Sequence, residues 1–410
     1  MQRIWFISKY GTIPEQNSAQ RQFSLSSNFS NQNLDTTLII SRSNTCNLNP
    51  SFKKYFKSTE YDRLKVITLN GPLISLGFSI KRILSWIIFE LNLLRYAYSI
   101  PKNQAPQIII VSSLSFFTLL SGVILKKRFK SKLIIEIRDI WPLTLIHLGK
   151  FKKNSLIIKV LEKIEKTGYL HADGIIGSMP RLDLHVKDII NKPFNYKCIP
   201  QGFSKAQYTS SLCEKDNTTI IDQLPKNKFV IAYAGTIGTV NLVDEIVTAA
   251  KILTDYSNIF FAIFGDGPLR KQLELDSCDL KNIKFFGAVS KYEIIPVLKN
   301  CNLLLSPINK SPVYDFGVSF NKWIDYMLSG RPILVSYSGY QSIINEADCG
   351  FFIEANNPEL MAEKIISIMK MDSNLLDEMG LRGYDYVIKN HNYQKLSTDY
   401  IDFINSIENN

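Results

Sequence analysis

Short apolar runs alternate with helical patterns along this 410-residue chain. Each run spans four to seven residues, ends in a polar or glycine-containing turn, and precedes apolar residues at helical spacing. Because strand, turn and helix in repeated succession build parallel sheets, the pattern predicts an α/β fold with doubly wound, Rossmann-like sheets. The expected strands lie at residues 3–8, 37–41, 64–69, 108–111, 133–137, 172–178 (including the following turn), 229–234, 260–264, 283–289, 303–307, 332–335 and 350–353.

Residues 103–125 contain no charge over 23 positions and precede a basic cluster, so their length suits a membrane span. Pro106 and the serine-rich segment 112–115 divide them, however, into a β-rich run and an apolar helix. A strand, turn and helix unit of the sheet explains this pattern, and a membrane span is the alternative.

Residues 72–100 predict an amphipathic helical region in which Lys81, Arg82 and Arg95 interrupt apolar clusters. Such a helix either lies partly on a membrane surface or is buried with a basic rim. The basic cluster at 126–130, together with Lys150, Lys152 and Lys153, is either a membrane-docking face or a solvated charge run.

The length and the 45% apolar content predict two domains. We expect a first domain at residues 1–203 joined by a C-terminal helix at 392–410, a linker at 204–228, and a second domain at 229–391. Residues 1–200 hold 29 Lys and Arg against 12 Asp and Glu, whereas the remainder holds 19 against 25. A basic first half favours anionic partners, and the absence of nucleic-acid motifs argues against nucleic acid.

The six cysteines are scattered without a CxxC pair, which is typical of reduced residues in a cytosolic protein. The first residues, 1–8, do not resemble a signal peptide, because the apolar run is short and leads into a glycine turn.

Residues 314–332 carry the most informative pattern in the chain. Gly317 and Ser319 predict the start of a helix, and Gly330 followed by Pro332 predicts its end. Asn321, Lys322 and Asp325 share one face of this helix near its positive end, which suits a phosphate. Lys322 can neutralise charge, and Asp325 can accept hydrogen bonds from a ribose diol. The alternative is an ordinary amphipathic helix with a polar outer face.

Two other places combine a strand end with polar or glycine residues. Arg138 and Asp139 follow the strand at 133–137 and are expected to point out of the sheet, either toward a ligand or as a salt bridge. The strand at 229–234 leads into Gly235, Thr236 and Gly238, whose backbone amides can hold phosphate oxygens. No GxGxxG motif follows the first strand, so a dinucleotide is not indicated.

These stretches resemble retaining glycosyltransferases of family 4, in particular the bacterial O-antigen and capsule branch that includes N-acetyl-fucosamine-type transferases. The resemblance rests on Asn-Lys-x-x-Asp-Tyr-Met at 321–327, Glu-x-Arg-Asp-x-Trp-Pro at 136–142, and Ile-Pro-Gln-Gly-Phe at 199–203. It implies a GT-B architecture of two facing Rossmann-like domains, with the nucleotide in the second and the acceptor in the first.

The resemblance also implies roles for individual residues. Asp325 is expected to bind the ribose, and Gly317 replaces the family's first acid, which binds the donor sugar. Thr236 and Asn241 stand where the family has an arginine and a lysine, so more of the diphosphate charge falls to Lys322. Arg138 and Asp139 are expected to face the donor sugar and acceptor. Donor contacts are implied for the remaining positions, Gly11, Gly235, Gly238, Ala288, Val318, Ser319 and Asn321, and Arg21 is implied on the acceptor side, with a surface cation as its alternative.

The same resemblance implies an enzyme that transfers a sugar from a nucleotide-diphosphate sugar, with retention of configuration and without a metal. We expect the nucleotide to be UDP. No cofactor is expected. The implied acceptor is an undecaprenyl-diphosphate-linked sugar, reached by a peripheral enzyme docked on the anionic inner face of the cytoplasmic membrane. Two alternatives remain open: a nucleotide-sugar 2-epimerase of the same architecture, and a catalytically inactive sugar-nucleotide-binding partner subunit.

Overall fold

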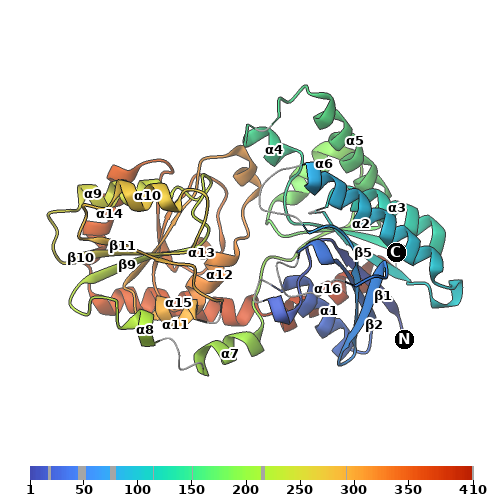
Figure 1. The fold of residues 1–410 in the computed structure, drawn as a ribbon, viewed down its shortest axis with the longest axis horizontal. Helices are drawn as coiled ribbons and strands as arrows, with labels where there is room; N and C mark the ends of the chain where they lie inside the picture. Colours follow the sequence, from blue (N-terminus) through green and yellow to red (C-terminus); the bar gives the residue numbers. More distant parts are fainter. Residues whose placement is uncertain are drawn as a thin grey trace. The chain divides into compact units, whose positions relative to one another are not determined.

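The computed structural model describes residues 1–16, 20–44, 52–73, 80–113, 115–149, 151–213, 218–291 and 293–408. The chain divides into two compact units. The first consists of Met1–Gln201 and Tyr393–Asn410, and the second of Gly202–Asn392. The first unit is therefore built from both ends of the chain, because the last helix returns to it (Figure 1).

The first unit contains an eight-stranded sheet of order β3-β4-β2-β1-β5-β6-β7-β8. All neighbouring strands pair in parallel except β3 and β4, which are antiparallel. The strands are β1 (Arg3–Ser8), β2 (Asp35–Ser41), β3 (Phe56–Tyr61), β4 (Leu64–Leu69), β5 (Ile108–Ser112), β6 (Lys132–Ile137), β7 (Gly174–Gly177) and β8 (Tyr196–Cys198). The helices are α1 (Arg21–Asn31), α2 (Ile80–Ser99), α3 (Thr118–Phe129), α4 (Leu143–His147), α5 (Leu156–His171), α6 (Leu182–Ile190) and α16 (Tyr393–Glu408).

Helices cover both faces of this sheet, and the residues of β1 show why. Successive side chains of a strand point to opposite faces. Ile4 and Phe6 pack in a core with α1 and α16, where Tyr400 lies 6.1 Å from the Phe6 ring. Trp5 points to the other face and contacts Tyr96 of α2 at 5.7 Å. In Figure 1 α1 and α16 lie on one side of the sheet, and α2, α3 and α5 lie on the other.

The final helix is bound to the first unit by an apolar stripe. Tyr393, Leu396, Tyr400, Phe403 and Ile407 recur at helical spacing and are buried. Gly174 of β7 permits the close approach, because a Cβ there would lie 2.3 Å from the Ile407 Cδ1 atom. Only the smallest residue fits against this helix at that point.

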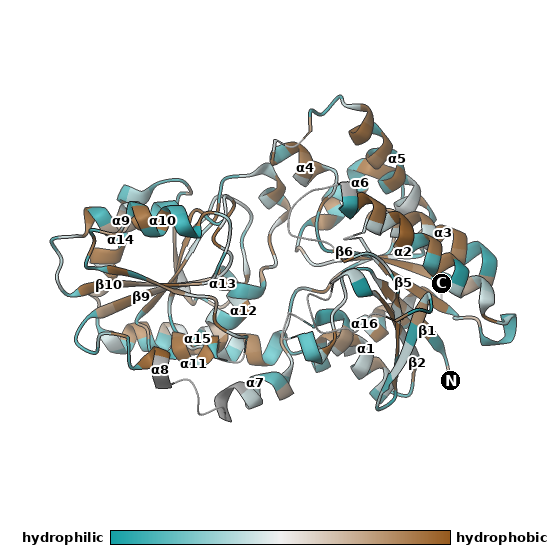
Figure 2. Cartoon of the chain, in the orientation of Figure 1, coloured by the Kyte–Doolittle hydropathy of each residue, from teal (hydrophilic) through white to brown (hydrophobic). Residues whose placement is uncertain are grey.

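The second unit contains a six-stranded, fully parallel sheet of order β11-β10-β9-β12-β13-β14. The strands are β9 (Phe229–Ala234), β10 (Ile259–Phe264), β11 (Ile283–Gly287), β12 (Leu303–Pro307), β13 (Ile333–Ser336) and β14 (Gly350–Ile353). The helices are α7 (Lys205–Cys213), α8 (Thr218–Ile221), α9 (Val243–Ile252), α10 (Arg270–Asp276), α11 (Ile294–Lys299), α12 (Asn321–Leu328), α13 (Ile343–Glu346), α14 (Pro358–Met369) and α15 (Ser373–Asn390). In Figure 2 the strands are mainly hydrophobic, whereas the helices carry both hydrophobic and hydrophilic residues. This distribution is typical of a sheet that is buried on both faces.

The fold corrects two sequence expectations and confirms a third. The region expected to be a linker carries α7 and α8, and it belongs to the second unit because Tyr208 and Leu224 are buried in that unit's core. A polar edge strand, β3, makes the first sheet mixed rather than purely parallel. The uncharged run 103–125 forms β5 and part of α3. Among the residues that the structure describes, no helix is long and apolar enough to cross a bilayer.

One buried carboxylate joins α2 to α3. Glu90 is 8% exposed and accepts hydrogen bonds from Ser115 at 3.2 Å, and from Thr118 and Ser121 at 2.6 Å each. Burial raises the pKa of Glu90 to about 7, although the three hydroxyl groups and the Lys9 ammonium favour the charged form. The carboxyl group is therefore poised to titrate near neutrality.

A Glu90→Gln variant is expected to flatten the pH dependence of stability. Because the folded-state pKa exceeds the ordinary 4.5, the folded protein retains a proton that the unfolded chain releases, so stability falls as pH rises from 4.5 to 7. Glutamine does not titrate, so the variant does not lose stability in this way as the pH rises. At pH 8 this loss in the unsubstituted protein should amount to about 3 kcal/mol of unfolding free energy. The urea midpoints of both proteins at pH 5 and pH 8 test this prediction. An equal change of midpoint between the two pH values in both proteins would contradict it.

Candidate functional site

Glycine-containing loops meet at the carboxyl ends of β9 and β10 in the second unit. The Gly235 amide donates to the Phe264 carbonyl at 3.0 Å, and the Ile237 amide donates to the Asp266 carbonyl at 3.0 Å. A Cβ on Gly265 would lie 1.8 Å from the Gly235 carbonyl oxygen. The two loops are thus packed backbone to backbone, which fixes the turn after β9 at the edge where open α/β sheets bind ligands.

Lys322 lies beside this turn. Its Nζ donates to the Asn241 Oδ1 at 2.8 Å, and Asn241 in turn donates to the Thr236 carbonyl at 3.0 Å. The ammonium also lies 5.4 Å from the ring centre of Tyr233 and 5.6 Å from that of Phe320. No carboxylate of the described residues forms an ion pair with it. Burial lowers the pKa of Lys322 to about 7.

Asp325 lies about one helical turn further along the same face and has a partner. Its two carboxylate oxygens both accept from the Lys291 Nζ at 2.5 Å. Asp325 is 14% exposed and Lys291 is 32% exposed, so solvent or a ligand reaches the pair. Lys291 follows β11, at the same edge of the sheet.

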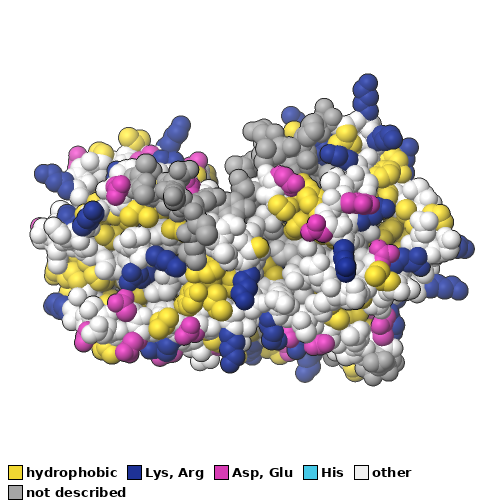
Figure 3. Space-filling view, turned by 90° about the horizontal axis from the view of Figure 1, so that it is seen from below, with side chains coloured by type: hydrophobic (Ala, Val, Ile, Leu, Met, Phe, Trp, Pro, Cys, Tyr) yellow, Lys and Arg dark blue, Asp and Glu magenta, His cyan; other side chains and the backbone are white. Residues whose placement is uncertain are grey.

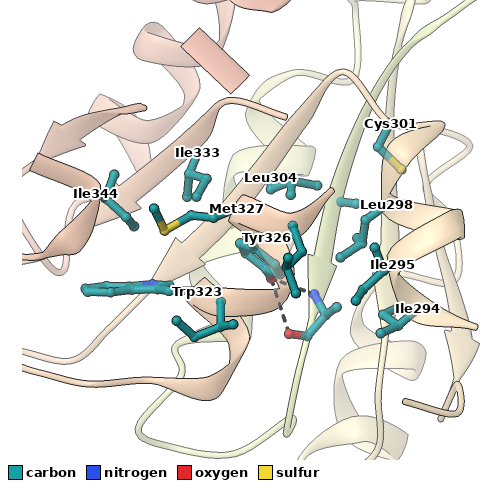
Figure 4. Close-up of a cluster of buried hydrophobic side chains, with 14 of the residues drawn as sticks. Ile294, Ile295, Leu298, Cys301, Leu304, Trp323, Tyr326, Met327, Ile333 and Ile344 are labelled. Carbon is teal, nitrogen blue, oxygen red and sulfur yellow. Dashed lines mark hydrogen bonds between the residues drawn. The ribbon is translucent and has the colours of Figure 1, made fainter. Parts of the chain in front are cut away.

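Buried side chains of α12 fix this helix to the sheet, among them Trp323 and Tyr326 (Figure 4). The Tyr326 hydroxyl accepts a hydrogen bond from the Ala234 amide at 2.8 Å and donates one to the Leu305 carbonyl at 3.0 Å. Trp323 donates to the Ser306 hydroxyl at 2.7 Å. Tyr326 and Trp323 join α12 to the ends of β9 and β12, and this fixes the position of Lys322 and Asp325 on the same helix.

The expected helix start is one turn too early. Gly317 ends a short 3-10 helix with φ 86°, a backbone conformation that favours glycine, and α12 begins at Asn321 after an extended Phe320. Val318 is buried, while Ser319 and Asn321 are partly exposed. Ala288 is exposed after β11, and Thr236 is exposed beside a partly buried Gly238. The structure thus gathers the expected donor residues of the second unit around the carboxyl edge of one sheet.

In the first unit, Arg21 is a buried ion-pair residue rather than a surface cation. It is 1% exposed, and its Nε donates to Glu136 at 2.9 Å. Its other nitrogens donate to the carbonyls of Pro200 and Ile199, the latter at 2.8 Å. With all these partners inside one unit, the guanidinium joins α1, β6 and the segment after β8.

Arg138 and Asp139 do not form a salt bridge with each other, which was the alternative to a ligand contact. Asp139 accepts from the Trp141 indole at 2.8 Å and from the Thr144 hydroxyl at 2.7 Å, so both oxygens are used at the start of α4. The Arg138 Nε is buried with no hydrogen-bond partner among the described residues, and burial lowers the pKa of this guanidinium. Glu136, the nearest acid in sequence on β6, pairs with Arg21 instead.

Gly11 is buried in the turn after β1, where its amide donates to the Ser8 carbonyl at 3.0 Å. A Cβ there would lie 2.6 Å from Ile40, so packing against the neighbouring strand requires glycine. This position therefore has a structural reason for its identity in addition to the expected ligand contact.

Two residues of the second unit's site were not expected from the sequence. Lys291 pairs with Asp325, and Tyr233 places its ring near the Lys322 ammonium. Both lie at or just after the carboxyl end of a strand, which is the signal that would have identified them.

The sequence of the second unit matches a known protein family. Residues 215–386 match the family model described as "Glycosyl transferases group 1". This part of the chain is similar to group 1 glycosyltransferases. It includes the loop after β9, Lys291, and the whole of α12.

Other similarities extend beyond the matched residues. The chain is 24% identical over 260 residues to the probable glycosyltransferase WbjE of Pseudomonas aeruginosa, a match that covers 60% of this chain and 62% of that protein. Among solved structures, sucrose-phosphate synthase of Thermosynechococcus elongatus superposes with a TM-score of 0.74 over 99% of both chains at 14% identity. HepE of Anabaena, solved with UDP and glucose, gives 0.67 over 99% of this chain and 100% of its own, also at 14% identity. These neighbours share the GT-B fold, so the predicted fold class is confirmed.

Proposed function

We propose that this chain transfers a sugar from a UDP-sugar to a lipid-linked saccharide, with retention of configuration and without a metal. The observation that carries this proposal is the placement of Lys322, which is held by Asn241 beside the turn after β9 and has Asp325 on the same helical face. Such a pair suits a nucleoside diphosphate, with the ammonium near the leaving phosphates and the carboxylate near the ribose.

The donor half of the site acts through fixed charges and dipoles. As the bond from the sugar to the diphosphate breaks, negative charge develops on the leaving oxygens, and a preorganised cation stabilises it without reorganising. The amides of the loop after β9 and at the start of α12 add donors. UDP is favoured because the related fold of HepE was solved with UDP and glucose.

The acceptor half is assigned to the first unit. An acceptor hydroxyl attacks the oxocarbenium-like carbon on the face from which the diphosphate leaves, which retains configuration and needs no enzymic nucleophile. Arg138 is proposed to face the ligands with its guanidinium, whose buried Nε has no hydrogen-bond partner among the described residues. Asp139 orients α4 through Trp141 and Thr144 and is proposed to exchange one of these bonds for a sugar hydroxyl.

Incubation of the protein with radiolabelled UDP-sugars and a bacterial lipid extract tests this proposal. Transfer of label into the lipid phase supports it. Conversion of the donor into an isomer would instead identify a 2-epimerase, and tight UDP-sugar binding with neither product would identify a binding subunit. The binding-subunit alternative is favoured by one observation, the neutral Thr236 and Asn241 where two cations are common in the family.

Asp325→Ala is expected to weaken UDP-glucose binding by about tenfold or more, because charged hydrogen bonds contribute about 1.5–3 kcal/mol. Isothermal titration calorimetry measures this directly. Asp377→Ala is a matched control, since Asp377 is 65% exposed and pairs with Arg331 in the same unit.

A Lys291→Ala variant separates two roles of Asp325. If the carboxylate binds the ribose, loss of its Lys291 partner leaves it free to do so, and affinity is retained. Equal losses of affinity in Lys291→Ala and Asp325→Ala would show that the ion pair only supports the local structure.

A further inference from the structure

The layer formed by α2, α3 and α5 in the first unit carries exposed apolar side chains in helical register. Along α2, Leu84, Ile87, Leu91 and Tyr98 are 50%, 44%, 61% and 58% exposed. They recur every three to seven residues, so they form one stripe along the outer face of the helix. A helix that packs only through its inner face usually carries polar residues on its outer face.

The neighbouring helices extend this stripe. Ile124 of α3 is 42% exposed, and Leu156, Ile157 and Val160 of α5 are 79%, 42% and 48% exposed. The three helices thus hold eight of the seventeen large hydrophobic residues that are exposed among the described residues, although they contain only 48 residues. Figure 1 shows the three helices on the same side of the sheet, and Figure 2 shows brown residues on α2 and α5. We call these eight residues and their helices the α2–α5 face.

The charge of the α2–α5 face is predominantly positive. The three helices contain nine Lys and Arg and only three Glu. Glu90 and Glu165 are buried, which leaves Glu162 as the one carboxylate of these helices near the surface. Opposite signs are interspersed on the side of the molecule seen from below, in Figure 3. A partner for the α2–α5 face must therefore accept apolar side chains and supply negative charge.

A cationic cavity borders this face at the C-terminal end of α3. The cavity of about 690 Å³ lies at the amino-terminal edge of the sheet, and its lining includes Arg3, Lys102, Lys127, Lys130 and Lys132. Its two carboxylates already have partners, since Asp173 binds Lys126 at 2.6 Å and Glu408 binds Gln2 at 2.5 Å. The nearby guanidinium of Arg128 lies 3.9 Å from the ring centre of Tyr98, which joins the cavity to the apolar stripe.

We propose that the α2–α5 face docks on an anionic phospholipid bilayer, with the apolar stripe in the interfacial region and headgroup phosphates at the cavity. Apolar residues flanked by cations bind membranes through both buried apolar area and attraction to anionic lipids. This proposal does not require the proposed donor site, but it would bring a lipid-linked acceptor to the same unit that we assign to the acceptor.

Co-sedimentation with vesicles tests the docking surface. The protein is expected to bind vesicles of phosphatidylcholine and phosphatidylglycerol at a ratio of about 7 to 3, and to bind pure phosphatidylcholine at least tenfold more weakly. Raising the NaCl concentration to about 1 M should reduce binding, because the Debye length then falls to roughly 3 Å and the attraction between charges is screened. Equal binding to both vesicle types, or to neither, overturns the proposal.

Paired substitutions locate the surface. Ile87→Asp with Leu91→Asp, and separately Lys127→Glu with Lys130→Glu, are each expected to lower vesicle affinity at least tenfold, since a single cation near the surface is worth about fivefold. Leu275→Asp is the matched control, because Leu275 of α10 is 68% exposed in the second unit. Unchanged binding in both pairs, or an equal loss in the control, contradicts the assignment.

Two further measurements distinguish membrane docking from self-association and from a defect in the donor site. If the stripe is instead an interface between two copies of the chain, light scattering will show a dimer that the Ile87→Asp and Leu91→Asp pair converts to a monomer, and vesicle binding will not change. UDP-glucose titration of the same variants reports on the donor site independently. Retained UDP-glucose binding with lost vesicle binding supports docking, and lost UDP-glucose binding with retained vesicle binding contradicts docking through these residues.

Discussion

Lys322→Met is expected to lower the kcat of sugar transfer from UDP-sugar by roughly a hundredfold to a thousandfold, the usual cost of removing one preorganised group from a developing anion. The Kd for the donor should rise by less, because the charge on the leaving diphosphate is greatest in the transition state. Steady-state kinetics and calorimetry measure the two effects. Lys310→Met provides the control, since Lys310 is 67% exposed and forms its ion pair with Glu354 rather than with a residue of α12.

The pH dependence of donor binding should identify Lys322 as the responsible group. Its pKa falls from 10.5 to about 7 in the free protein, so part of the population is neutral at physiological pH. A bound diphosphate favours the ammonium, and UDP-glucose is therefore expected to bind with uptake of a proton and to lose affinity as pH rises above 7. Calorimetry in buffers of different ionisation enthalpy measures that uptake, and it should vanish in Lys322→Met.

The lowered pKa of Lys322 also affects stability, with the opposite sign from Glu90. Because the folded-state pKa lies below the ordinary value, the unfolded chain holds more protons between pH 7 and 10.5, and Lys322 makes stability rise with pH through that window. Lys322→Met should therefore stabilise the free protein most below pH 7. An unaltered stability profile in this variant would mean that the ammonium is better solvated than the structure indicates.

Arg21→Met is expected to destabilise the first unit by about 3–5 kcal/mol, because it leaves the Glu136 carboxylate buried without its cation. Urea unfolding followed by far-UV circular dichroism gives the change. The double variant with Glu136→Leu should lose much less than the sum of the single variants, since no charge is then left buried. Arg382→Ala removes an exposed ion pair with Asp348 and should cost less than about 1 kcal/mol.

The buried strands were predictable from the sequence because burial on both faces gives continuous apolar runs, as in β1, β5 and β9. Strand β3 was not predicted, because its sequence Phe-Lys-Ser-Thr-Glu-Tyr is polar and only partly buried. It exists because β4 supplies hydrogen-bonding partners through an antiparallel turn. Helix α15 was also missed, and its low apolar content and two glycines explain why the helical period is weak.

For the candidate site, the local sequence predicted which residues lie side by side on one helix. It did not predict their contacts with residues that are distant in the sequence. Lys322 and Asp325 share a face because of helical spacing alone. Their partners, Asn241 and Lys291, are 81 and 34 residues away in sequence. The same holds for Arg21 and Glu136, which are 115 residues apart. Such pairs depend on which strands are neighbours in a sheet, and apolar periodicity does not contain that order.

The return of α16 to the first unit has a consequence for synthesis on the ribosome. Domains usually fold in the order in which they emerge, the first one first. Here the core around Phe6 and Phe29 lacks Tyr400 and Ile404 until α16 leaves the exit tunnel. The second unit, whose residues end at Asn392, is therefore complete before the first, and the order of maturation runs against the order of translation.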